Sequence, residues 1–115
     1  MFLSQLEFLR HMLDECSYII KVTEGKTQQQ VTDDETLSRA IVRSLEIIGE
    51  ATRRIEPDMK YRYPQIDWKD MAGMRDRLIH HYFGIDYDIV FSTVTIDIPD
   101  LHYEIQRIIE IENRK

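Results

Sequence analysis

Apolar residues recur at steps of three and four along the first part of the chain, which is the spacing of one face of an α-helix. The positions on this face are Phe2, Leu6, Leu9, Leu13, Cys16 and Ile20. Gly25 and the polar stretch KTQQQ follow them, and both are typical of a helix end and a loop. The pattern predicts a helix over about residues 2–23.

A second run with the same spacing predicts a helix over about residues 33–56. Its apolar face carries Leu37, Ile41, Ser44, Ile48, Ala51 and Ile55. Thr32 and Glu35 have the three-residue spacing of a capping box at the start of this helix. Pro57 is expected to end it, because a proline ring clashes with the preceding helical turn.

The stretch PDMKYRYPQI reads as a connector with room for one helical turn, and a third helix is expected beyond it. Asp67 can cap this helix, which is predicted over about residues 68–81 and should end before Gly84.

Asp86 can cap a further helix over about residues 87–97. Pro99 either begins a last helix over about residues 99–113 or lies inside one continuous helix, and both alternatives stay open. No stretch predicts a β-strand. The expected fold is therefore all-α, an antiparallel bundle of four to five helices.

The composition is that of a folded protein of one domain, residues 1–115. Hydrophobic residues make up 43% of the chain and charged residues 31%, and the formal net charge is −6. This acidic balance disfavours a protein that coats nucleic acid with its whole surface, but it leaves room for a local cationic site. Cys16 is the single cysteine, so no internal disulfide can form. We expect a cytoplasmic protein with no signal peptide and no membrane partner.

Residues 74–84, MRDRLIHHYFG, carry the candidate chemistry. Arg75 is a permanent cation whose planar guanidinium suits phosphate oxygens. His80 exchanges a proton near neutral pH and can act as a general base. In RNA cleavage, such a base takes the 2′-OH proton while the cation stabilises the phosphorane, and no metal is required. Asp76 lies four positions before His80 and can orient its ring, while Tyr82 offers a hydroxyl.

An ideal helix does not bring these groups to one point, because Arg75 and His80 diverge by about 140° around its axis. Two explanations remain open. The helix can unwind near His80, or two copies of it can meet across a two-fold axis so that both motifs line one cleft.

Other candidates have plainer interpretations. His81 is expected to be solvated or packed, and His11 and His102 to face solvent. Glu46 and Glu50 are expected to be polar groups of the surface or of an interface, although they can also approach the site. Seven cations of the middle third can gather into a local basic rim, although most are ordinarily solvated surface charges: Arg53, Arg54, Lys60, Arg62, Lys69, Arg75 and Arg77. No cofactor and no metal site are expected.

The motif stands in a context that is more specific than its own spacing. The segment from Asp67 to Pro99, together with SRAIVRSLEIIGEATRRI and YPQIDWKDMAGMRD, resembles the HEPN toxin of bacterial MNT–HEPN toxin–antitoxin systems, the HepT-like family. The signature R-x4-H-x-Y of that family is matched by Arg75, His80 and Tyr82, and Asp76 matches the polar residue that often follows the arginine.

This resemblance implies a HEPN-like helical domain that dimerises through the helices carrying the motif. It implies a metal-independent endoribonuclease toxin of a type VII-like toxin–antitoxin pair, with Arg75 and His80 as catalytic residues in a composite cleft of the homodimer and Asp76 in support. The partner would be an MNT-type nucleotidyltransferase antitoxin that neutralises the toxin by adding AMP to Tyr82, or by masking the cleft.

Two other classes of function use the same residues. A non-catalytic nucleotide- or RNA-binding module, or adaptor, would use Arg75 and His80 to hold phosphate. A structural subunit would need only its dimer surface.

Overall fold

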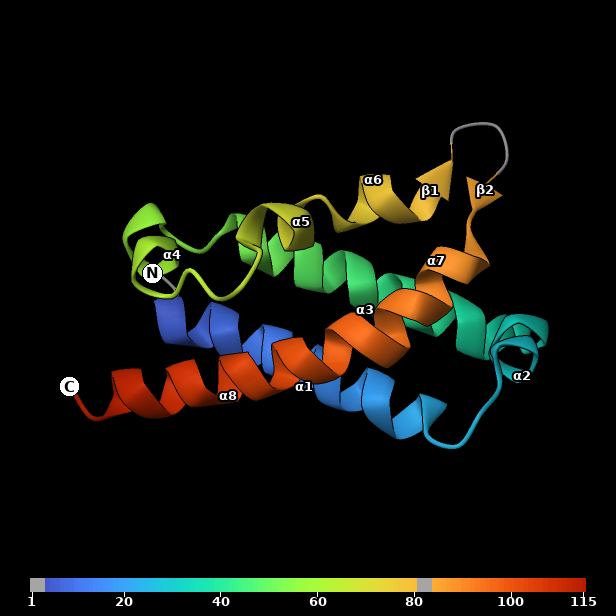
Figure 1. The fold of residues 1–115 in the computed structure, drawn as a ribbon, viewed down its shortest axis with the longest axis horizontal. Helices are drawn as coiled ribbons and strands as arrows, with labels where there is room; N and C mark the ends of the chain where they lie inside the picture. The colour runs from blue at the N-terminus through green and yellow to red at the C-terminus, as the bar shows by residue number, and fades with distance from the viewer. Residues whose placement is uncertain (1–3, 81–83) are drawn as a thin grey trace.

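The structure, a computed structural model, describes residues 4–80 and 84–115, with only the backbone of His80. It is all-α, as predicted, except for one short hairpin that the sequence does not predict (Figure 1). The long helices are α1 (Gln5–Thr23), α3 (Glu35–Arg53) and α8 (Ile98–Asn113). The short ones are α2 (Gln28–Asp33), α4 (Pro57–Arg62), α5 (Trp68–Ala72), α6 (Met74–Leu78), α7 (Tyr87–Ser92) and the π-helix η2 (Thr93–Asp97). Within the described residues, no helix is both long and apolar enough to cross a membrane.

The three long helices bury the predicted apolar stripes against one another. Helix α1 packs against both α3 and α8. The fully buried side chains of this core include Leu9, Met12, Ile19, Ile41, Leu45, Ile48, Ile98, Ile105 and Ile108. Cys16 lies in the same core, where burial, followed by the charge of Glu15, raises the pKa of its thiol to about 12. The thiol is therefore an inert packing group.

The start of α3 differs from the prediction in its capping residues. Thr27 and Gln30 form the capping box, and they begin the short helix α2 inside the stretch that was predicted to be a loop. Asp34, and not Thr32, caps α3 by accepting a hydrogen bond from the backbone N–H of Leu37. Thr27 and Gln30, and then Thr32 and Glu35, have the three-residue spacing of a capping box, but only the first pair forms one.

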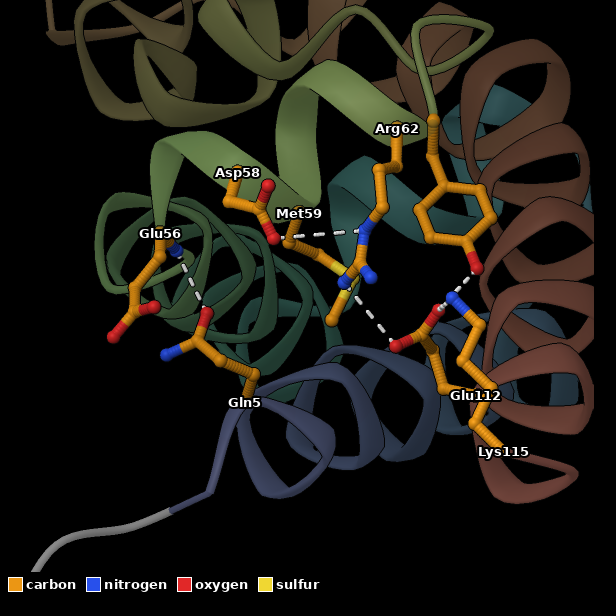
Figure 2. A network of polar contacts seen from close by, with 8 residues as sticks. Gln5, Glu56, Asp58, Met59, Arg62, Glu112 and Lys115 are labelled. Carbon is orange, nitrogen blue, oxygen red and sulfur yellow. Dashed lines mark hydrogen bonds and ion pairs between the residues drawn. The ribbon is translucent and has the colours of Figure 1, made fainter.

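The end of α3 and the connector after it are fixed by polar contacts (Figure 2). The backbone N–H of Glu56 donates to the Gln5 side chain over 2.7 Å, next to Pro57, which begins α4 instead of ending α3. At the other end of α4, the Tyr63 hydroxyl donates to the carboxylate of Glu112. This hydrogen bond holds the pKa of Glu112 below its usual range, and burial raises the pKa of Tyr63. The connector is thereby tied to the last turn of α8.

The predicted third helix is broken, and the prediction that the chain has no strand is wrong. Asp67 caps α5 as expected, but Gly73 separates α5 from α6. Strands β1 (Ile79–His80) and β2 (Gly84–Ile85) then form a small antiparallel hairpin. Gly84 adopts a φ of +76°, which lets the chain reverse where a side chain would be strained.

Pro99 lies inside a continuous helical segment, which is the second of the two alternatives. Asp86 caps α7 as predicted, and α7, η2 and α8 then follow without a break (Figure 1). The N–H of Ile98 bonds to the carbonyl of Thr93, five residues back. This wide π-helical turn accommodates a proline that has no N–H and whose ring would crowd a regular α-helical turn.

Candidate active site

Helix α6 presents Arg75 at the surface because its other face is anchored in the core. Met74 and Leu78 are fully buried, and α6 packs against α3. The approach is close at Gly49 of α3, where a Cβ atom would lie 3.3 Å from Cβ of Met74 and 3.2 Å from the carbonyl oxygen of Met71. Gly49 therefore sets how near the site-bearing segment lies to α3.

The guanidinium of Arg75 is available to a ligand. Its side chain is 70% exposed, and its Nε atom lies 3.9 Å from Oε2 of Glu46, a residue of α3. An exposed ion pair at that separation contributes little to stability. Arg75 is thus an accessible cation with Glu46 beside it, and its role as a catalytic residue stays a prediction.

Arg77 is a structural residue, although it was considered for the basic rim. Its side chain is 30% exposed and donates to Asp70 and to Asp97, each over 2.9 Å. These two charge-assisted bonds link α6 to α5 and to η2. Sequence reasoning missed this role because Asp97 approaches only through the fold.

Asp76 is exposed on α6, and among the described residues its side chain forms no ion pair or hydrogen bond. Its predicted support of His80 stays a prediction, because the side chain of His80 lies outside the described residues. Tyr82 and His81 also lie outside them.

The backbone between Arg75 and His80 leaves helical geometry. Helix α6 ends at Leu78, and Ile79 has the extended angles φ −109° and ψ 119°. His80 then pairs with Gly84 in the hairpin. Of the two explanations for the divergence of Arg75 and His80, the structure contains the first: the helix ends two residues before His80. The 140° divergence of an ideal helix no longer applies.

A groove of about 260 Å³ runs beside Arg75, between α3 and the segment α5–α6. It is lined by Arg43, Glu46, Gly49, Glu50, Arg53, Ala72 and Arg75. Arg53 is held in place by donating from Nε to the carbonyl oxygen of Ala72 over 3.0 Å. Glu46 and Glu50, which the sequence favours as polar groups of the surface or of an interface, both line the groove beside Arg75, so the groove carries charges of both signs.

The seven predicted rim cations do not gather around this groove. Only Arg53 and Arg75 of that set line it. Arg77 is engaged by Asp70 and Asp97, and Arg62 lies 3.2 Å from Glu112 at the far end of α8. Across residues 4–80 and 84–115, no three His, Cys, Asp or Glu side chains are grouped as a metal site.

Comparison with known proteins identifies the family. The family described as "Ribonuclease HepT-like" matches residues 12–108 of the chain. A protein of Caldanaerobacter subterraneus subsp. tengcongensis named "Putative RNase TTE0752" is 40% identical over 91% of this chain and 94% of its own length. "Putative RNase MJ0127" of Methanocaldococcus jannaschii is 42% identical over 90% of this chain and 85% of its own.

"Probable ribonuclease HepT" of Thermococcus cleftensis is 36% identical, over 91% of this chain and 96% of its own. No solved structure matches. The family match covers most of the chain, and it includes the whole of α3, α6 and the R-x4-H-x-Y segment. The chain belongs to the HepT-like ribonuclease family.

Proposed function

We propose that this protein is an endoribonuclease toxin that needs no metal, and that residues 1–115 form its single catalytic domain. One observation carries the proposal beyond family membership. Arg75 is an exposed cation on α6, and the helix ends at Leu78, so the backbone turns before His80. This arrangement supports a site in which an accessible cation and an acid–base group act on the same phosphate.

In the proposed reaction, His80 removes the proton of a ribose 2′-OH. The 2′-oxygen attacks the adjacent phosphorus, and the bond from phosphorus to the 5′-oxygen breaks. The 5′-oxygen takes up a proton from water, which leaves a 2′,3′-cyclic phosphate and a 5′-hydroxyl, and the protonated His80 then returns its proton to the hydroxide that remains. Arg75 stabilises the negative charge of the phosphorane, and Asp76 orients the His80 ring.

The site is proposed to be composite, with Arg75 and His80 of two copies lining one cleft of a homodimer. The cleft then holds two sites, each with Arg75 of one copy and His80 of the other. The exposure of Arg75 supports this arrangement, because within one chain the described residues leave its guanidinium open to the solvent. A second copy would enclose the cation and exclude water from the reacting phosphate.

The toxin is proposed to be restrained by an MNT-type nucleotidyltransferase antitoxin in a type VII-like pair. The Tyr82 hydroxyl oxygen would attack the α-phosphorus of ATP, forming a phosphodiester bond and releasing pyrophosphate, while the phenolic proton passes to solvent. The added phosphate would pair with Arg75 and place negative charge where the RNA phosphate should lie.

Mixed dimers test whether the site is composite. Arg75→Ala and His80→Ala are each expected to be nearly inactive, and refolding them together should restore about a quarter of the wild-type rate of RNA cleavage. About half of the randomly formed dimers would be mixed, each with one intact site of two. The heterodimer, isolated with two different tags, is then assayed alone.

If isolated heterodimers stay inactive while the wild type cleaves, the site lies within one chain. If the folded wild-type dimer binds RNA without cleaving it, and Arg75→Ala weakens that binding, the non-catalytic binding module replaces the ribonuclease.

A further inference from the structure

The exposed face of α3 carries a regular pattern of charges. Six of its charges are Glu35, Arg39, Arg43, Glu46, Glu50 and Arg54, the last being the C-cap residue of the helix. Arg53, at the edge of the same face, is held by its hydrogen bond to the carbonyl oxygen of Ala72. At 3.6 residues per turn the six positions fall within a stripe about 100° wide. In chain order their signs are negative, positive, positive, negative, negative and positive.

This order is complementary to itself when it is reversed. If a second copy of α3 lies antiparallel, with a two-fold axis passing between Ser44 and Leu45, each position meets its mirror position along the chain. Glu35 then faces Arg54 of the other copy, Arg39 faces Glu50, and Arg43 faces Glu46. Every pair joins opposite charges, and the symmetry makes each pair twice. A parallel copy in register would set like charges against each other.

Contacts within the chain leave part of this pattern unused. Arg39 lies 2.7 Å from Glu35, and Arg54 lies 3.7 Å from Glu50, both one helical turn apart and strongly exposed. Such exposed pairs exchange partners at little cost. Arg43 forms no ion pair with any described residue, yet it lies in the middle of the stripe.

Residues of the stripe line two grooves. One is the groove beside Arg75, and Arg43 and Glu50 line both grooves. The other, of about 340 Å³, lies between α1 and α3 and is lined by Phe8, His11, Arg43, Ile47, Glu50, Ala51 and Arg54. Phe8 and Ile47 provide apolar contact there.

We propose that this face of α3 pairs with the same face of a second copy, antiparallel and in the register given above. The inference rests on the proposed function and deepens it, since it names the surface that assembles the composite site. Glu46 lies beside Arg75 in its own chain and faces Arg43 of the other copy. The two Arg75 side chains therefore lie close to the two-fold axis, where both copies line the same groove.

Charge reversals at one pair of positions test this register. Arg39→Glu and Glu50→Arg each set like charges against each other twice in a homodimer. Each variant alone is expected to weaken dimerisation about tenfold or more in sedimentation velocity. In an equimolar mixture, the substituted position 39 of the Arg39→Glu chain faces the substituted position 50 of the Glu50→Arg chain. The unchanged Glu50 of the first chain faces the unchanged Arg39 of the second, so both pairs again join opposite charges. The mixture is expected to dimerise within about threefold of the wild-type affinity.

This rescue cannot arise from effects inside one chain, because the mixed chains keep their own substitutions. The double variant Arg39→Glu/Glu50→Arg provides a second check, since it should dimerise with itself. Circular dichroism verifies that each variant is helical. The inference is overturned if the single variants dimerise like the wild type, or if neither the mixture nor the double variant recovers.

Failure of this inference is distinguishable from failure of the proposed function. RNA cleavage by the wild type is measured separately and does not depend on which face forms the dimer. Conversely, if α3 forms the interface, the wild type, the variants and their mixture would show the expected dimerisation even if the wild type had no nuclease activity.

Discussion

Replacement of Arg75 by alanine is expected to slow RNA cleavage by about 10²- to 10³-fold, because the phosphorane loses a cation positioned to stabilise it. The free energy of unfolding should change by no more than about 0.5 kcal/mol. The side chain is exposed and its one described ion pair, with Glu46, is long. The cleavage rate of Arg75→Lys should fall between those of the wild type and Arg75→Ala, since an ammonium group cannot bond two phosphate oxygens as a guanidinium does.

Arg77→Ala is the matched control, two residues away on the same helix. It should lower the free energy of unfolding by about 1–3 kcal/mol, because Asp70 and Asp97 each lose a charge-assisted hydrogen bond. Denaturant unfolding measures the stability of both variants, and cleavage is assayed where both are folded. A folded Arg75→Ala protein with wild-type activity would remove Arg75 from the site, and parallel losses of activity and stability would make it structural.

Addition of AMP to Tyr82 is expected to abolish cleavage almost completely. The protein is incubated with ATP and the MNT-type nucleotidyltransferase, and its intact mass should rise by whole AMP units. Modified protein should lose at least about 10²-fold in cleavage rate, since phosphate bound to Arg75 removes the same cation that Arg75→Ala removes.

Tyr82→Phe separates this modification from simple masking. It keeps the ring but lacks the oxygen that would accept AMP, so its mass should stay constant and its cleavage should persist in the presence of ATP and the transferase. Equal modification of Tyr82→Phe would show that the acceptor is another residue. Inhibition of Tyr82→Phe without any mass change would instead favour masking of the cleft by the bound antitoxin.

The long helices were predictable because burial on one face leaves a periodic record in the sequence. The stripes through Leu9 and Cys16 and through Ile41 and Ile48 lie in the core as expected. The helix over 68–81 was predicted too long, since its break depends on tertiary packing. Gly73 by itself is compatible with a helix. The break there is fixed by the burial of Met74, and the end of α6 is fixed by the hairpin in which His80 pairs with Gly84.

The candidate site was predictable only in its motif. Arg75 was chosen from its chemistry and spacing, and the structure places it at an exposed position. The groove beside it could not be foreseen, because Glu46 and Arg53 reach it only through the packing of α6 on α3. The role of Arg77 depends in the same way on Asp97, twenty residues away.

Cleavage of RNA in the presence of EDTA tests the central claim most directly. The wild-type protein, purified by itself, and a matched His80→Ala protein are incubated with total bacterial RNA, with and without EDTA. The wild type should cleave equally in both, and loss of the general base should slow His80→Ala by about 10²- to 10⁴-fold. Equal cleavage by the two proteins, none by either, or wild-type cleavage that EDTA abolishes and a divalent metal restores would contradict a metal-independent ribonuclease with His80 in its site.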